Sequence, residues 1–197
     1  MGEMTPEQVK ELLRRTGVLL EGHFKLTSGR HSPMFLQCSQ VMQYPHEAGP
    51  LAAALAARLA GVECDTVIGP AMGGIVLGYE VGRTLGKRAI FAERQDGTMT
   101  LRRGFSIQAG ERLVVVEDAI STGGSVREVM SVVREHGGEV VAVAMLVDRS
   151  GGQVDFGIPS YSMLELTVPS YPPEDCPLCR AGVPLTLPKS KAGGPGR

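Results

Sequence analysis

The chain has 197 residues, of which 43% are hydrophobic, and it carries a formal net charge of −1. This length and apolar content suffice for one full hydrophobic core, so we expect a single domain with a small N-terminal appendage. No apolar run reaches the roughly 18 residues that a membrane helix needs, no N-terminal signal pattern is visible, and the near-neutral charge offers nucleic acid no broad basic surface. We therefore expect a cytoplasmic protein that binds neither membrane nor nucleic acid.

A capping box marks the start of the first predicted helix, with Thr5 and Gln8 around a proline at the first helical position. Gly17 ends this helix. A second helix is expected over about 46–60, which is rich in alanine and leucine and stops at Gly61. Such a composition is typical of a helix that packs on a sheet.

The segment 24–35 lies between these helices and reads FKLTSGRHSPMF. Its glycine and proline favour a loop. Arg30 offers a planar guanidinium suited to carboxylate or phosphate, and Phe35 offers a face for a flat ring. By itself the segment is equally well a surface turn with one core phenylalanine, so it becomes informative only beside a second motif.

Four short apolar runs predict a parallel sheet. They cover 65–69, 88–92, 112–116 and 140–147, with helical patterns between the first two and between the last two. A further edge strand is expected at 160–166. The expected fold class is therefore α/β, with a parallel β-sheet flanked by helices.

Two turns in this sheet carry groups that suit an anion. The first is PAMGGI at 70–75, where backbone N–H groups open the helical pattern that follows the strand. The second is 93–107, ERQDGTMTLRRGFSI, which predicts a hairpin that turns at Asp96-Gly97. Its arginines favour an electrostatic role towards phosphate, although a solvated basic hairpin would carry the same residues.

The stretch 113–126, LVVVEDAISTGGSV, is the most informative part of the chain. Its valines predict a strand buried on both faces, and hydroxyls and glycines at 121–125 then lead into a helix, as a phosphate loop requires. Glu117 and Asp118 would repel a phosphate, so they must face sugar hydroxyls or a magnesium ion instead. A ligand with phosphate, hydroxyls and metal together is a sugar phosphate.

The strand at 140–147 ends in Asp148-Arg149. In open α/β sheets ligands occupy the crevice beyond the carboxyl ends of the strands, which would place Arg149 beside the phosphate loop. A surface arginine after a strand is the equally simple alternative.

The 113–126 pattern resembles the phosphoribosyl pyrophosphate signature of the type I phosphoribosyltransferases, and 24–35 resembles the N-terminal segment of the orotate phosphoribosyltransferases. The resemblance spans roughly residues 5–166. It implies the type I phosphoribosyltransferase fold with a small N-terminal hood. It also implies transfer of the phosphoribosyl group to orotate, giving orotidine monophosphate and pyrophosphate in pyrimidine synthesis, with magnesium carried by the substrate and a homodimer with shared active sites.

The resemblance implies roles for individual residues; Arg94, Arg102 and Arg103 are the arginines that remain in the hairpin, where this chain departs from the family pattern. Those implied to bind phosphoribosyl pyrophosphate are Glu117, Asp118, Ala119, Ile120, Ser121, Thr122, Gly123, Gly124, Ser125, Met72, Gly73 and Arg94. Those implied to bind orotate are Ser121, Arg149, Phe35 and Leu36. Those implied to be catalytic are Asp118, Arg102 and Arg103.

The hairpin at 93–107 departs from the family pattern. The family usually carries an Arg-Lys pair, another lysine and a histidine there, whereas this chain has no lysine or histidine between Arg88 and His136. Arginine stays charged and forms bidentate hydrogen bonds with phosphate, but it does not readily give a proton. The hairpin is thus expected to act electrostatically. In the other motif, Thr27 replaces a lysine that the family often has.

Two alternative functions stay open. One is a phosphoribosyltransferase for another base, either a purine or uracil. The other is a non-catalytic regulator that senses phosphoribosyl pyrophosphate and binds nucleic acid; the missing lysines and histidine favour it, and the absence of a basic excess disfavours it.

The cysteines and the C-terminal tail complete the chain. Cys176 and Cys179 have the spacing of half a zinc site, but the other ligands would have to be distant, so reduced thiols are expected and zinc is the minority alternative. We divide the chain into an N-terminal helix and hood at 1–45, a core at 46–187 and a tail at 188–197. The tail lacks apolar residues and is expected to be disordered.

Overall fold

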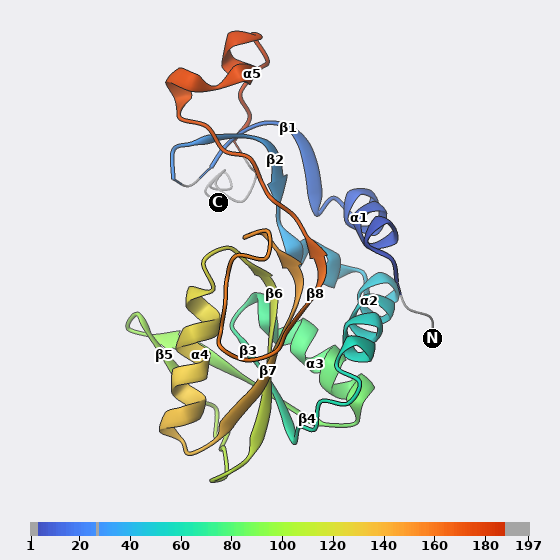
Figure 1. Ribbon diagram of the computed structural model, residues 1–197, viewed down its shortest axis with the longest axis vertical. Helices are drawn as coiled ribbons and strands as arrows, with labels where there is room; N and C mark the ends of the chain where they lie inside the picture. Colours follow the sequence, from blue (N-terminus) through green and yellow to red (C-terminus); the bar gives the residue numbers. More distant parts are fainter. Residues whose placement is uncertain (1–3, 27, 188–197) are drawn as a thin grey trace, which may run out of the picture.

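The computed structural model describes residues 4–26 and 28–187 (Figure 1). Its centre is a six-stranded sheet with the order β5-β4-β3-β6-β7-β8. The strands are β3 (Thr66–Pro70), β4 (Arg88–Gln95), β5 (Thr98–Leu101), β6 (Arg112–Ile120), β7 (Glu139–Asp148) and β8 (Ser160–Glu165). Neighbours run parallel, except that β5 pairs antiparallel with β4. The predicted α/β fold is confirmed, and the hairpin that turns at Asp96-Gly97 adds one antiparallel edge strand.

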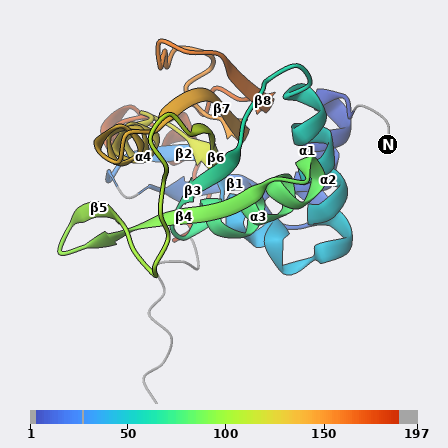
Figure 2. The same ribbon diagram turned by 90° about the horizontal axis from the view of Figure 1, so that it is seen from below.

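Helices cover both faces of the sheet (Figure 2). They are α2 (Pro45–Arg58), α3 (Gly73–Leu85) and α4 (Gly124–Glu135). Val114 and Val116 belong to the core that contains α2 and α3, whereas Val115 belongs to the core that contains α4. All three valines are fully buried, which is the two-sided burial that a β-branched run predicts for a central parallel strand.

The N-terminal helix α1 (Pro6–Arg15) begins at the predicted capping box. The Thr5 hydroxyl accepts a hydrogen bond from the Gln8 backbone N–H at 3.3 Å, and the Gln8 side chain accepts one from the Thr5 N–H at 2.9 Å. The helix buries Val9, Leu12 and Leu13 in the core that contains α2 and α3. It is therefore joined to the sheet domain.

A two-stranded hairpin stands at one end of the sheet, formed by β1 (Leu19–Lys25) and β2 (His31–Leu36) (Figure 1). Most of the 24–35 segment is thus strand rather than the expected loop, because its backbone groups pair across the hairpin. The 3-10 helix η1 (Cys38–Gln43) then leads from β2 into α2.

The C-terminal segment 171–187 completes this hood; it contains η2 (Pro173–Asp175) and α5 (Pro177–Arg180). Tyr171 and His31 exchange two backbone hydrogen bonds of 2.8 Å, and Thr186 forms a parallel bridge with Phe24. The sequence places 171–187 in the core, because no local pattern identifies a partner so distant along the chain. In the structure this segment pairs with the hairpin, so the hood is built from both ends of the described chain.

The tail at 188–197, predicted to be disordered, lies outside the described residues. Within the part of the chain that the structure covers, no helix combines the length and the hydropathy needed to cross a membrane.

Candidate active site

The turn after β3 lies directly against the end of β6, and glycines make this approach possible. A Cβ atom added to Gly69 would collide with the Gly74 carbonyl oxygen, and one added to Gly74 would lie 2.7 Å from the Val116 carbonyl oxygen. A Cβ atom on Gly73 would lie 2.5 Å from the Asp118 carboxyl group. The predicted anion-binding turn therefore meets the acidic pair, with the Met72 side chain 81% exposed beside it.

The loop between β6 and α4 opens the helix towards a cavity. Gly123 adopts φ +74°, a backbone conformation that favours glycine. No side chain of the described residues caps the helix, so the N–H groups of its first turn are available to a ligand. The positive end of the helix dipole and these free donors together suit a phosphate.

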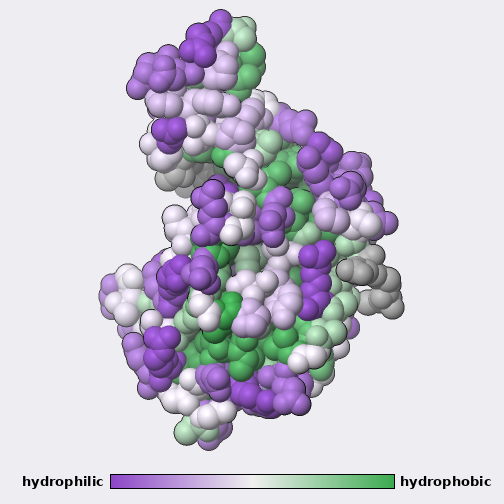
Figure 3. Space-filling view, viewed as in Figure 1, coloured by the Kyte–Doolittle hydropathy of each residue, from purple (hydrophilic) through white to green (hydrophobic). Residues whose placement is uncertain are grey.

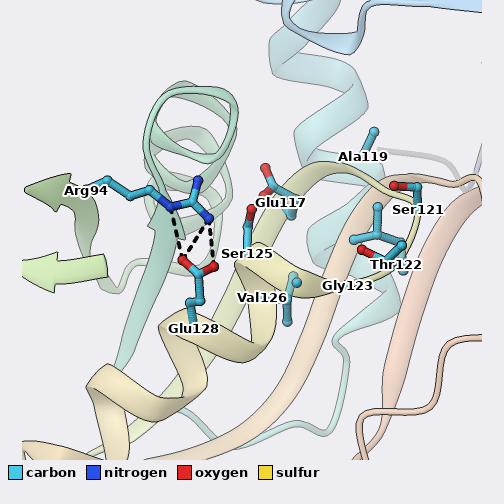
Figure 4. Close-up of a pocket in the computed structure, with 11 residues that line it drawn as sticks. Arg94, Glu117, Ala119, Ser121, Thr122, Gly123, Ser125, Val126 and Glu128 are labelled. Carbon is cyan, nitrogen blue, oxygen red and sulfur yellow. Dashed lines mark hydrogen bonds and ion pairs between the residues drawn. The ribbon is translucent and has the colours of Figure 1, made fainter. Parts of the chain in front are cut away.

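A cavity of about 270 Å³ lies over this loop (Figure 4). Its lining contains most of the residues assigned to phosphoribosyl pyrophosphate. The lining residues are Arg94, Glu117, Ala119, Ile120, Ser121, Thr122, Gly123, Gly124, Ser125, Val126 and Glu128. Figure 4 shows the Arg94 and Glu128 side chains at one end of this group and Ser121 and Thr122 at the other. The structure thus brings hydroxyls, backbone donors, a carboxylate and a guanidinium together around one hollow.

The acidic pair lies at this cavity, with Glu117 buried and Asp118 half-buried. Glu117 is 8% exposed and accepts a hydrogen bond from the Asp118 backbone N–H at 3.0 Å. Burial, followed by the charge of Asp118, raises the pKa of Glu117 to about 8. Burial also raises the pKa of Asp118, against the opposing effect of the Arg149 charge. Among the described residues, no ion pair involves either carboxylate, so hydroxyl donors or a cation would relieve them.

We expect the free energy of unfolding of the ligand-free protein to fall as pH rises from about 5 to about 8. The pKa of Glu117 is about 8 in the folded protein, against an ordinary value of 4.5 for a glutamate carboxyl. A raised pKa contributes stability that is present below the unfolded value and is lost as pH rises through the folded value, by several kcal/mol at most for a shift this size. Urea denaturation of wild type and Glu117→Gln across this range measures it. Parallel profiles for the two proteins would contradict the burial argument.

Arg94 reaches the cavity from β4 but is already paired. Its guanidinium nitrogens lie 2.7–3.1 Å from the carboxylate oxygens of Glu128 on α4 (Figure 4). Both side chains are partly exposed, so the pair is a weak one. A ligand phosphate would therefore compete with Glu128 for Arg94.

Arg102 and Arg103 lie outside the residues that line the cavity. Arg103 forks onto Glu93 with N–O distances of 2.8 and 3.0 Å, and an Arg102 nitrogen lies 3.6 Å from a Glu93 oxygen. In this conformation Glu93 therefore holds both guanidinium groups on the hairpin. The geometry does not yet bring them to the phosphate loop, and they would have to leave Glu93 to do so.

Arg149 follows β7 and lies beside the phosphate loop, as predicted. Its backbone N–H donates to the Ile120 carbonyl at 2.9 Å, and its charge opposes the rise that burial causes in the pKa of Asp118. Within the described residues its buried Nε has no hydrogen-bond partner. A buried donor left unpaired costs about 1–3 kcal/mol, so this atom suits the acceptor of a bound ligand.

The hood residues assigned to orotate differ in their placement. Phe35 is partly exposed and lies against Phe24, with the ring centroids 5.9 Å apart. Leu36 is 7% exposed and packs in the hydrophobic core, so its side chain does not reach a ligand here. Arg30 donates to the hydroxyl of Ser170 at 2.9 Å and to its carbonyl at 2.5 Å. Of the two hood residues assigned to orotate, Phe35 is therefore the one that is partly exposed.

The loop that contains Val154, Asp155 and Phe156 packs against the phosphate loop. The sequence alone did not predict this contact. A Cβ atom on Gly123 would lie 2.7 Å from the Phe156 ring and 2.9 Å from Val154. Arg127 lies over the Phe156 ring at 5.0 Å and donates to the Asp155 carbonyl at 2.7 Å. These contacts join parts of the chain about thirty residues apart, and no local pattern could have identified them. Glu128, the partner of Arg94, was missed for the same reason.

Comparison with known proteins agrees with this arrangement. Residues 45–170 match the phosphoribosyl transferase domain family. The chain is 54% identical over 188 residues to an orotate phosphoribosyltransferase from Pelotomaculum thermopropionicum, which covers 95% of this chain and 99% of the relative. It is 56% identical over 190 residues to the enzyme of that name from Heliobacterium modesticaldum, which covers 95% and 100%.

The solved structures agree as well. The crystal structure of orotate phosphoribosyltransferase from Aeropyrum pernix superimposes with a TM-score of 0.66 at 25% identity, over 80% of this chain and 93% of that one. The fold and the cavity define a phosphoribosyltransferase of type I. Within that class, the identity over nearly the full length of its relatives places the chain in the orotate phosphoribosyltransferase family.

Proposed function

We propose that this protein transfers the 5-phosphoribosyl group from phosphoribosyl pyrophosphate to orotate, giving orotidine 5'-monophosphate and pyrophosphate. The observation that carries the proposal is a cavity lined by the phosphate loop and the buried Glu117, with the Asp118 carboxyl group beside it against the turn at Gly73. Near-identical length and 54% identity to a protein named for this activity support the choice of substrate.

The substrate would be held at three points. The N–H groups and hydroxyls of 121–125 would bind the 5'-phosphate, since they line the cavity at the start of α4. Glu117 and Asp118 would accept hydrogen bonds from the ribose hydroxyls. The backbone at Met72 and Gly73 would lie beside the pyrophosphate, because Gly73 is in contact range of the Asp118 carboxyl group.

Orotate would be placed by Arg149 and Phe35. The unpaired Nε of Arg149 is a donor for the orotate carboxylate, and Ser121 at the cavity wall offers a second polar contact. Phe35 would support the ring. An orotate held in this way would have a ring nitrogen on the side of the sugar C1 opposite the pyrophosphate, and such alignment would supply much of the acceleration.

Charge develops as the bond between C1 and the pyrophosphate oxygen breaks. The pyrophosphate leaves with the electron pair of the broken bond, the orotate nitrogen forms the new bond to C1, and the proton of its N–H passes to solvent or to the departing pyrophosphate. The carboxylates of Glu117 and Asp118 would stabilise a cationic C1, while backbone donors and arginines would stabilise the departing anion. Magnesium would arrive with the pyrophosphate and neutralise part of its charge, and Asp118 is the oxygen donor of this chain that would lie next to it.

A direct assay tests the proposed reaction. Orotate, uracil, adenine and hypoxanthine are each supplied with phosphoribosyl pyrophosphate, with and without magnesium, and pyrophosphate release is measured. We expect pyrophosphate release only when orotate is the base and magnesium is present. Turnover of another base would favour the alternative phosphoribosyltransferases, and binding of phosphoribosyl pyrophosphate without any release would favour the regulator.

We expect the double variant Arg102→Ala, Arg103→Ala to lose about 10- to 100-fold in kcat, because the two guanidinium groups that it lacks would stabilise the leaving pyrophosphate. Its stability should change little, because in the free protein these groups form only weak surface pairs with Glu93. Steady-state kinetics and urea denaturation measure the two effects. Arg83→Ala, which removes a similarly exposed pair with Glu80, is the matched control. A wild-type rate in the double variant would reject the role of the hairpin.

Two further properties belong to this proposal. A homodimer is favoured by the apolar side chains that α3 and its preceding turn expose, namely Met72, Val76 and Tyr79, and sedimentation would measure the mass in solution. A cytoplasmic location is favoured by the free thiols of the four cysteines.

A further inference from the structure

Four metal-binding side chains converge in the hood, away from the cavity described above. They are His23 on β1, His31 on β2, and Cys176 and Cys179 around α5. Their ligand atoms all lie within 4.8 Å of one another. The cysteines are the pair with zinc spacing in the sequence, and the two histidines are the distant partners that spacing alone could not identify.

We propose that these four side chains bind a structural zinc ion that fastens the C-terminal segment to the hood hairpin. Two thiolates and two imidazoles in tetrahedral array are a preferred zinc ligand set, and the usual Zn–S and Zn–N bond lengths separate neighbouring ligand atoms by about 3.3–3.8 Å. Here His23 Nε2 lies 3.1 Å from His31 Nδ1, 3.5 Å from the Cys176 sulfur and 3.7 Å from the Cys179 sulfur. The four atoms are therefore already at nearly the spacing of a zinc site.

The hydrogen bonding of His23 fixes the ring for this role. Its Nδ1 lies 2.8 Å from the Val183 carbonyl oxygen, which can only accept, so Nδ1 carries the proton and Nε2 keeps its lone pair. A zinc-bound histidine almost always donates its other N–H to a carbonyl or carboxylate in this way. The acceptor comes from the same C-terminal segment as the two cysteines, so the segment supplies both ligands and the group that orients a third.

The burial of the cluster matches a structural site rather than a catalytic one. His23, His31 and Cys176 are 2%, 5% and 0% exposed, whereas Cys179 is exposed. Four protein ligands fill the tetrahedral positions and leave none open for a substrate. The exposed Cys179 gives the ion a path in and out.

The C-terminal segment needs such a fastening because it has almost no core of its own. Neither η2 nor α5 buries any residue, and Val183, Leu185 and Leu187 are exposed. Figure 1 places α5 at the end of the molecule far from the sheet, and Figure 3 shows a mainly hydrophilic surface on this lobe. Small units without enough apolar burial are commonly held by metals. Here the ion would hold the segment on the hairpin that also carries Phe35.

Metal content of the full chain tests the proposal. The protein is purified without chelator under reducing conditions, supplied with zinc and desalted, and its zinc is measured by mass spectrometry. We expect about one zinc per wild-type chain and less than about 0.1 in the double variant Cys176→Ala, Cys179→Ala. Cys64→Ala, which removes a buried thiol outside the cluster, is the control and should keep the wild-type content. No zinc in wild type, or equal zinc in the double variant, would overturn the proposal.

A second measurement does not depend on a variant that folds. Wild-type protein freed of metal is titrated with cobalt, which takes the same ligands and absorbs visible light strongly when it is tetrahedral and bound by thiolates. We expect these bands to saturate at about one cobalt per chain and zinc to abolish them, with zinc also raising the thermal midpoint by more than about 5 °C. Weak bands typical of six-coordinate cobalt, with no thermal shift, would overturn the proposal. Both readouts are independent of phosphoribosyl transfer.

Discussion

Asp118→Asn should lower kcat/KM by about 100- to 1,000-fold, since it removes one or two charge-assisted hydrogen bonds to the ribose worth about 1.5–3 kcal/mol each. The neutral amide keeps the shape of the side chain, so the backbone of the 71–74 turn should not move. Because burial raises the pKa of Asp118, the free protein holds this charge at a cost. The variant should therefore be as stable as wild type or more so, while it loses activity.

Steady-state kinetics and urea denaturation of the same preparations check both halves of this prediction. Asp65→Asn is the matched control, because Asp65 is an exposed carboxylate that receives a backbone hydrogen bond from Arg112 at 2.9 Å, next to the start of β3 and β6. Its kinetics should stay at the wild-type level. If Asp118→Asn also kept wild-type kinetics, the assignment of the acidic pair to the ribose would be wrong.

Gly123→Ala should damage both stability and substrate binding. The new methyl group would sit at φ +74° and 2.7 Å from the Phe156 ring, and the two penalties together amount to about 2–4 kcal/mol. Relief of the contact would displace the phosphate loop, so affinity for phosphoribosyl pyrophosphate should fall at least about tenfold, as one charge-assisted hydrogen bond is lost.

Gly86→Ala separates the two penalties. Gly86 has φ +65° and no atom within 4 Å of an added Cβ, so only the backbone cost of about 1 kcal/mol remains. Denaturation midpoints and titration calorimetry of both variants measure the difference. Equal stability losses would show that the loop behind Gly123 gives way freely, against the packing argument.

The sequence predicts those parts of the site that depend on residues close together in the chain. Val114, Val115 and Val116 identify a strand buried on both faces, and the run from Glu117 to Ser125 identifies its loop, because both depend on neighbouring residues. The resemblance to a known family adds the substrate. Arg149 is reached through a general property of parallel sheets rather than through its own neighbours.

Residues that depend on distant partners were not predicted. Leu36 follows a family pattern, but it packs in a hydrophobic core whose other members lie far from the motif in the sequence. The arginines of the hairpin look free in the sequence, yet Arg94 and Arg103 are paired with Glu128 and Glu93. Segment 171–187 has no hydrophobic period that would assign it to the hood.

The hood brings together residues 153 positions apart in the chain, as between His23 and Cys176. Closing so long a loop in an unfolded chain is entropically costly, but the finished sheet already holds the two ends near each other. The C-terminal segment 171–187 should therefore bind to the hairpin late in folding. A molecule interrupted just before residue 171 would contain the complete sheet and the phosphate loop but only the β1–β2 part of the hood, so its ability to bind a base would depend on segment 171–187.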